Sequence, residues 1–201
     1  MRKVKLQISA GAVLLAALIY YIGDAGSLAA LLIPAAVHEL GHIAAIYMLG
    51  LRVSGFRAEL KGFCIDYRGY AGALGHAAAA FMGPAAGFLY AWAASWAGNR
   101  YGSNWLCLSA GASLLLSAFN CLPALPLDGG RITANLAIAF LGNRRGGRFA
   151  ELTSLMTGAA LLGAGFWLMY LGRGAALTVA AIWLLLYQES GQGIVKSREL
   201  L

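Results

Sequence analysis

Charged side chains are scarce in this chain, and their scarcity decides its class. Only 11% of the residues are Asp, Glu, Lys or Arg, whereas 60% are hydrophobic and the mean hydropathy is +0.70. A soluble domain of similar size carries about 25% charged residues. The composition therefore excludes an ordinary soluble protein and predicts an integral membrane protein. The length of 201 residues favours a single domain, 1–201.

Cysteines are few as well. Cys64, Cys107 and Cys121 are scattered, odd in number and without Cys-x-x-Cys spacing, so neither a disulfide framework nor a cysteine zinc site is expected. The net charge of +7 would suit a nucleic-acid partner. The basic residues, however, lie in short loops between apolar runs, which is typical of membrane proteins. We therefore expect the lipid bilayer, and no nucleic acid, as a partner.

Apolar runs of helical length predict an all-α polytopic membrane protein with about six transmembrane helices. The runs cover residues 6–22, 28–49, 70–97, 105–122, 150–171 and 175–187. A half-helix over 132–141 and a basic loop over 142–148 are expected between the fourth and fifth runs. With both termini in the cytoplasm, every basic residue except Arg100 and Arg173 falls on the inner side. The expected location is the cell membrane, with several crossings.

Residues 52–69 have a different pattern from the apolar runs around them. Apolar and charged residues mix there, with Lys61-Gly62 at the centre. This pattern predicts a short β-hairpin at the membrane surface between the second and third helices. An amphipathic surface loop is the alternative interpretation. A hairpin would offer an edge strand that could hold a substrate in an extended form by β-augmentation.

The segment His38-Glu39-Leu40-Gly41-His42 lies inside the second apolar run and has the form H-E-x-x-H. Histidines at i and i+4 lie on one face of a helix, roughly one helical turn apart, so both imidazoles can bind one Zn²⁺. Glu39 can then accept a proton from a metal-bound water. A charged side chain within the membrane costs about 2.5–3.5 kcal/mol on insertion scales, which favours a functional role for Glu39.

Catalytic zinc usually has three protein ligands and one open position. The chain has only eight acidic residues and one further histidine, His76, which is interpreted as a polar interface residue. Asp128 is the best candidate for the third ligand, because it follows a Pro-rich break in an apolar run at a depth that matches the histidine pair. Asp128 could instead be a turn residue before Gly129-Gly130. The third ligand could also be a glutamate, and Glu151 is the only glutamate near the start of a predicted span.

Three motifs together resemble the site-2 protease family of intramembrane zinc metalloproteases. They are H-E-x-x-H, the segment 120–130 (Asn-x-x-Pro-x-x-Pro-Leu-Asp-Gly-Gly), and Gly83-Pro84-Ala85-Ala86-Gly87. The last is similar to the family's Gly-Pro-x-x-Asn element, although Gly87 replaces the Asn. The compact layout is most similar to the branch of sporulation factor IVFB, here without a CBS pair or a PDZ-like insertion. The resemblance implies a catalytic core over about 28–141.

The resemblance also implies a set of roles. His38, His42 and Asp128 would bind one Zn²⁺ per chain, Glu39 would be the general base, and Asn120 would contact substrate. The implied activity is cleavage of membrane-associated or transmembrane proteins in regulated intramembrane proteolysis. Expected partners are the membrane protein substrate and an inhibitory or regulatory membrane protein. The alternatives are a catalytically inactive scaffold and a metal-binding membrane protein, and the glutamate next to a ligand argues against a simple metal carrier.

Overall fold

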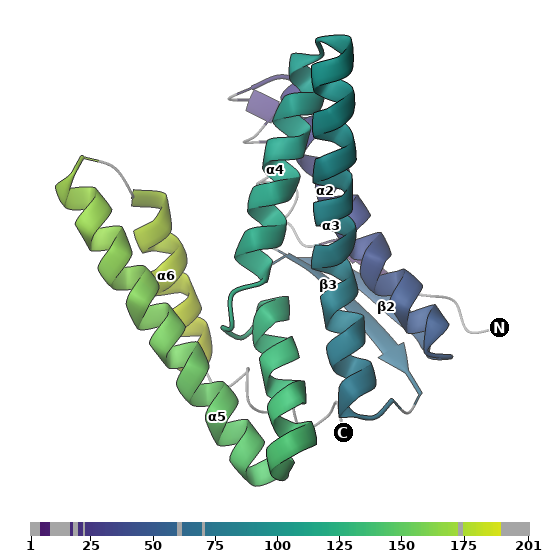
Figure 1. Cartoon of the computed structure of the whole chain (residues 1–201), viewed down its shortest axis with the longest axis vertical. Helices are drawn as coiled ribbons and strands as arrows, with labels where there is room; N and C mark the ends of the chain where they lie inside the picture. Colours follow the sequence, from purple (N-terminus) through teal and green to yellow (C-terminus); the bar gives the residue numbers. More distant parts are fainter. Residues whose placement is uncertain are drawn as a thin grey trace. The chain divides into compact units, whose positions relative to one another are not determined.

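The structure is a computed structural model that describes residues 5–8, 17, 20–21, 23–59, 62–69, 71–172 and 175–189 (Figure 1). The elements are β1 (Lys5–Ile8), α2 (Ala25–Met48), β2 (Arg52–Glu59), β3 (Gly62–Arg68), α3 (Ala73–Tyr101), α4 (Asn104–Asn120), α5 (Asp128–Tyr170) and α6 (Ala175–Glu189). They form two compact units. The first comprises Met1–Ala71 and Phe81–Phe119, and the second comprises Gly72–Ala80 and Asn120–Leu201. The predicted single domain and its catalytic core stay predictions.

Helix α2 of the first unit has a defined start and end. The Ser27 amide donates a 2.6 Å hydrogen bond to Asp24 Oδ1, so Asp24 is the N-cap and the helix begins three residues before the predicted apolar run. At the other end Gly50 adopts φ +72°, a conformation that glycine takes without strain. Between these ends the helix contains Pro34 and presents His38 among its buried residues.

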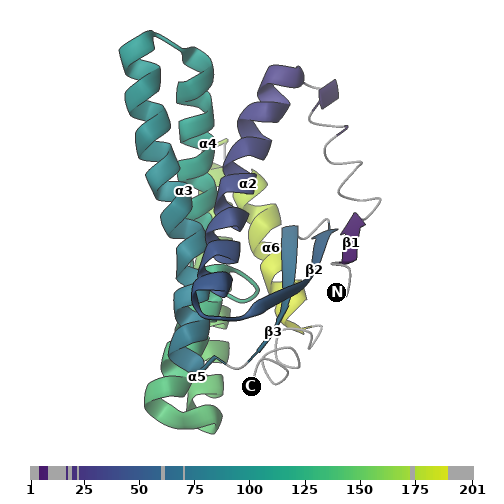
Figure 2. The same ribbon diagram turned by 90° about the vertical axis from the view of Figure 1, so that its right-hand side faces the viewer.

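The strands form a three-stranded sheet in the order β1-β2-β3 (Figure 2). β2 and β3 pair antiparallel, with Phe56 opposite Ile65 and an irregularity between Val53 and Gly55. β1 pairs parallel with β2, so the predicted helix over 6–22 is wrong at its start. Lys5–Ile8 alternates polar and apolar residues, which favours a strand when a partner edge is available. Residues 9–16, 18, 19 and 22 of that predicted helix lie outside the described residues.

In the first unit, helix α4 packs against α3 through small side chains (Figures 1 and 2). Ser109, Ser113 and Ser117, spaced by four residues along α4, are all fully buried. Ser113 Oγ donates a 2.8 Å hydrogen bond to the Gly87 carbonyl, and Ser109 Oγ lies 2.8 Å from the Tyr90 hydroxyl. Close contacts between small residues and interhelical hydrogen bonds are the usual basis of helix packing in lipid, where apolar burial gives no advantage.

In the second unit, α5 consists of two helical arms that meet at Gly142. This glycine has φ +77° and ψ 165°, a non-helical conformation that reverses the chain (Figure 1). Residues on both sides of Gly142 are helical, so the predicted basic loop over 142–148 is wrong except at the glycine itself. A Cβ on Gly146 would lie 2.5–2.6 Å from the backbone of Ala137 and Ile138, which shows how closely the arms pack. α6 lies along the second arm, with Thr178 against Gly165.

The helices carry the surface expected of a membrane protein. Three of those described are long and apolar enough to cross a bilayer, namely α2, α3 and α5, while α4 and α6 are shorter. Leu89, Trp92 and Trp96 follow one face of α3 and are 61–69% exposed. In water such a face would be a large apolar patch, whereas in lipid it is solvated. The predicted count of six spans, the surface position of the strands and the orientation of the termini stay predictions.

Candidate metal centre

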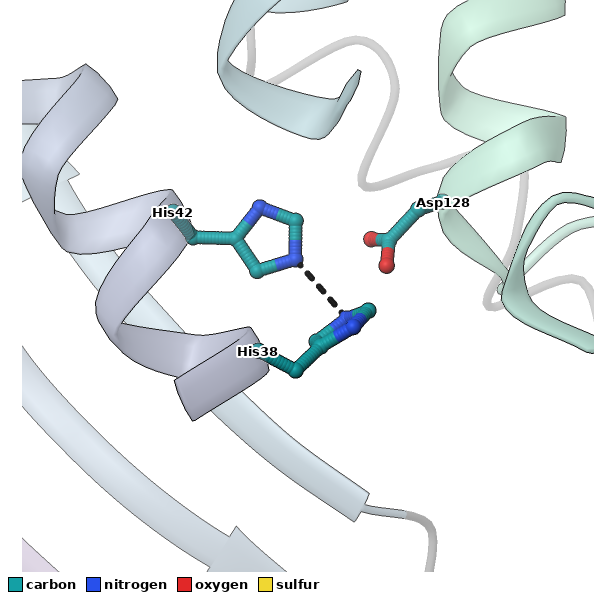
Figure 3. Close-up of side chains that lie close together, drawn as sticks. All are labelled: His38, His42 and Asp128. Atoms are coloured by element: carbon teal, nitrogen blue, oxygen red, sulfur yellow. Dashed lines mark hydrogen bonds between the residues drawn. The ribbon is translucent and has the colours of Figure 1, made fainter. Parts of the chain in front are cut away.

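His38 and His42 point their rings at the same place from one face of α2 (Figure 3). Their Nε2 atoms lie 3.2 Å apart, and the ring planes are inclined by 77°. Two imidazole nitrogens bound to one tetrahedral zinc at ~2.0–2.1 Å would be separated by about 3.3–3.4 Å. The Nε2 atoms of the pair are therefore separated by about the distance that two ligands of one zinc ion require, and His38 is buried at 3% exposure.

Glycines make room for this pair inside the first unit. A Cβ on Gly83 of α3 would collide with the imidazole of His42, and a Cβ on Gly41 would collide with the Met82 carbonyl. Side chains at either position would push α2 away from α3 or displace the ring. The Gly-Pro element of α3 and the glycine inside H-E-x-x-H therefore have a physical reason, since both bring His42 against the α3 backbone.

Glu39 follows His38 directly on α2 and is half-buried. Its neighbour Leu40 is 60% exposed, so the helix passes from the buried face that carries His38 to an exposed apolar face within three residues. A carboxylate next to a ligand and at the margin of a buried face is placed to exchange a proton with water bound near that ligand. The role of general base stays a prediction.

Asp128 belongs to the second unit and is the first residue of α5, not a residue of a turn. Its side chain is buried, at 6% exposure, and Arg131 Nη1 lies 3.8 Å from its Oδ1. A carboxylate in the first turn of a helix is favoured by the helix dipole. Both Arg131 and the helix dipole therefore favour the ionised form of Asp128.

The segment before Asp128 is irregular and closely packed. It contains a cis Leu125-Pro126 peptide and is tied to the second arm of α5, because Ser154 Oγ accepts a 3.1 Å hydrogen bond from the Leu125 amide. A Cβ on Gly129 would collide with the carbonyl of Cys121, and one on Gly130 would collide with the backbone of Ala124. The two glycines allow α5 to begin directly against the preceding loop, and this contact fixes the position of Asp128.

His38, His42 and Asp128 each offer one ligand atom, and these atoms lie within 4.8 Å of one another (Figure 3). They are the group of potential metal ligands found in the described part of the chain. The donor set suits zinc, which binds imidazole nitrogen and carboxylate oxygen and keeps a fourth position open in catalytic sites. A Cys-rich or all-oxygen set would have favoured a structural zinc or a Mg²⁺ site instead.

The other candidates lie elsewhere. Glu151 is exposed on the second arm of α5 and is not in the group, so the interpretation with a glutamate ligand loses its only candidate. His76 is buried at the start of α3 and is not in the group either. Asn120 is the half-buried last residue of α4. Its predicted contact with substrate stays a prediction.

Sequence reasoning missed Arg131, which the ion pair with Asp128 places beside the candidate site. The signal was available in the sequence, since residues at i and i+3 of a helix face each other. It also missed the strand β1, whose alternating residues Lys5–Ile8 precede the expected first helix.

The fold is similar to that of the site-2 protease from Methanocaldococcus jannaschii, with a TM-score of 0.68 and 18% sequence identity. The similarity covers 92% of this chain and 89% of that chain. No protein-family model matches the sequence, and no curated protein matches it. At this identity the likeness shows the fold alone, so the resemblance of the three motifs to the site-2 protease family is supported at the level of the fold. The assignment to the branch of sporulation factor IVFB stays a prediction.

Proposed function

We propose that this chain is an intramembrane zinc metalloprotease that hydrolyses peptide bonds of membrane-associated or transmembrane proteins. The observation that carries the proposal is the group of His38, His42 and Asp128 in a chain that has the fold of a site-2 protease. The helices that are long and apolar enough to span a bilayer support the location of the reaction.

His38, His42 and Asp128 would hold one zinc ion per chain, and the chemistry that such an ion would supply is polarisation of the scissile carbonyl and a lowered pKa of bound water, towards ~7. Glu39 would accept a proton from the attacking water and then deliver it to the nitrogen of the leaving amine, so that the C–N bond is exchanged for a C–O bond. The buried position of His38 and the glycine contacts of His42 keep both rings in place during this proton transfer.

The sheet provides a route to an extended substrate. A transmembrane helix has every amide hydrogen-bonded, so it must unwind before its backbone can be attacked. In the described sheet, β2 is flanked by β1 and β3, so the outer edges are those of β1 and β3, and the edge of β3 is the one that the hairpin offers to a further strand. We propose that the substrate adds to this edge by β-augmentation, and that Asn120 binds it near the scissile bond.

The same proposal includes a cellular setting. The protein would cross the cell membrane several times with both termini in the cytoplasm, because this orientation places nearly all basic residues on the inner side. Its activity would belong to regulated intramembrane proteolysis, controlled by an inhibitory or regulatory membrane protein. The uneven distribution of basic residues between the predicted inner and outer loops supports the orientation. The regulatory partner is inferred from the resemblance alone.

The test is the zinc content of the purified chain, together with cleavage of a transmembrane peptide. We expect one zinc per chain in the unsubstituted protein and loss of zinc in Asp128→Ala, because two ligands hold the ion far more weakly than three. Glu151→Ala is the matched control, since it removes an exposed carboxylate of the same unit and should leave zinc unchanged.

Each contrary outcome has a defined meaning. Undiminished zinc in Asp128→Ala would remove this residue from the ligand set. Bound zinc without cleavage of any transmembrane peptide would favour the alternative of a metal-binding membrane protein. A chain that binds no zinc at all would favour an inactive scaffold.

A further inference from the structure

The reversal of α5 forms an exposed tip that the proposed chemistry does not use. Two apolar helical arms run into it, and Gly142 turns the chain between them (Figure 1). The close contact of Gly146 with the backbone of Ala137 and Ile138 makes the reversal compact. We call residues 140–149 the basic tip. It lies wholly within the second unit.

The basic tip carries three positive charges and no negative ones. Arg144, Arg145 and Arg148 are all exposed, and residues 129–150 contain no Asp or Glu. Within the described ranges no carboxylate forms an ion pair with any of the three arginines. Arg144 and Arg148 are four residues apart in a helical segment, so they lie on one face. A local charge of +3 thus remains available to an external anion.

Aromatic side chains flank the arginines on both sides. Phe140 is 79% exposed at the end of the first arm, and Phe149 is 47% exposed at the start of the second. An exposed Phe next to an Arg cluster is unfavourable in water but suits the boundary between acyl chains and headgroups. Arginine also binds phosphate oxygens with two parallel hydrogen bonds, which a lysine cannot do.

We propose that the basic tip binds the phosphate-bearing headgroups of anionic phospholipids, with Phe140 and Phe149 in the adjoining acyl region. Charge complementarity argues for this partner, because anionic headgroups attract basic segments at the membrane surface. The position of the tip argues for it as well, since it joins two apolar arms and therefore emerges where hydrocarbon ends. The inference does not rest on the proposed protease activity, because it needs neither zinc nor a substrate.

The experiment measures lipid bound to the full-length chain purified in a neutral detergent. Phosphatidylglycerol and phosphatidylcholine are added in turn, and lipid retained per chain is determined by native mass spectrometry. We expect preferential retention of phosphatidylglycerol. Each arginine near an anionic surface contributes about fivefold to binding, so Arg144→Gln, Arg145→Gln and Arg148→Gln combined should lower the preference on the order of 100-fold.

Two control variants distinguish lipid binding by the basic tip from the loss of any exposed arginine and from a disturbed turn. Arg100→Gln removes an exposed arginine from the last turn of α3 and should leave the preference unchanged. Replacing the three arginines by Lys keeps the charge, and this variant should retain more phosphatidylglycerol than the Gln variant. A Lys variant no better than the Gln variant would overturn the proposal, because the loss would then reflect a disturbed turn.

Further results of the lipid-binding experiment would also overturn the proposal. Equal retention of both lipids by the unsubstituted chain would overturn the inference. So would displacement of the lipid by soluble glycerol phosphate or by polyglutamate at equal concentration, which would indicate a free anion or an acidic protein as the partner. Zinc content is measured in the same samples and should be identical in all variants, so a failure here is distinguishable from a failure of the proposed protease function.

Discussion

The two parts of the chain that supply the candidate metal ligands are built in opposite ways. His38 and His42 come from one regular helix, where a spacing of four residues is enough to bring their Nε2 atoms to 3.2 Å. Asp128 comes from the end of an irregular segment with a cis Leu125-Pro126 peptide and two glycines in close backbone contact. The arrangement of the two histidines depends on the periodicity of the helix, whereas the position of Asp128 depends on the packing of the whole segment before it.

This difference predicts different sensitivities. Apart from Gly41, which packs against the α3 backbone, substitutions beside the histidines, such as one at Glu39, should change chemistry while α2 stays intact, because the helix is held by its own hydrogen bonds. Substitutions beside Asp128 should change structure first and metal binding as a consequence. Three variants, considered from the largest expected effect to the smallest, test this contrast.

The largest effect is expected for Glu39→Gln on α2. The amide keeps the size of the side chain but cannot accept a proton from water, so cleavage should fall by roughly 10²–10⁴-fold. Zinc per chain should stay as in the unsubstituted protein, because both histidines remain. The measurement pairs a transmembrane-peptide cleavage assay with metal analysis, and Glu151→Gln serves as the control. Full activity in Glu39→Gln would exclude this residue as the base.

An intermediate effect is expected for Gly129→Ala in the second unit. The added Cβ would collide with the Cys121 carbonyl, and such overpacking typically costs about 1–3 kcal/mol. The loop should shift, and zinc should be held more weakly although no ligand is changed. Thermal unfolding and zinc titration provide the two readouts.

The matched control is Gly111→Ala, an exposed helical glycine of α4 whose Cβ would meet nothing within 4 Å. There alanine should be neutral or stabilising by about 0.5–1 kcal/mol. Normal zinc binding and normal stability in Gly129→Ala would show that the Asp128 side is as tolerant as the histidine side, and the contrast would be lost.

The smallest effect is expected at the start of α2. The Ser27 amide stabilises ionised Asp24 and holds the pKa of that carboxyl below its ordinary value. A lowered folded-state pKa means that the contribution is fully present above the ordinary pKa of about 3.9 and is lost as the pH falls through the lowered value. Asp24→Ala should therefore lower the Tm slightly at pH 7, and the difference from the unsubstituted chain should shrink at pH 3. A Tm difference that is the same at pH 3 and at pH 7 would show that it does not come from the ionised Asp24 side chain.

The sequence was most informative where one helix carries the whole pattern. The histidine pair followed from spacing alone, and α2, α3 and α4 lie close to the apolar runs that predicted them. Asp128 could be selected because few ionisable residues compete for the role, but its packing against the Cys121 carbonyl could not be foreseen. Such a contact depends on loop backbone geometry, which no periodicity encodes.

Two errors have identifiable causes. The apolar character of residues 6–22 concealed the alternation in Lys5–Ile8, and the partner edge of β2 selects the strand there. Residues 142–148 were expected to be a loop because they combine three glycines with three arginines. Gly142 alone supplies the reversal, and the packing of Gly146 allows the helix to resume at once.

The serine contacts between α3 and α4 have a consequence for biosynthesis. The two helices are separated only by Gly102 and Ser103, and the bonds from Ser113 to Gly87 and from Ser109 to Tyr90 join residues fewer than thirty positions apart. Contacts so local in the chain form quickly. This helical pair can therefore be complete once Asn120 has left the ribosome, when Asp128 has not yet been placed. The packing of α3 against α4 therefore does not depend on the segment that carries Asp128.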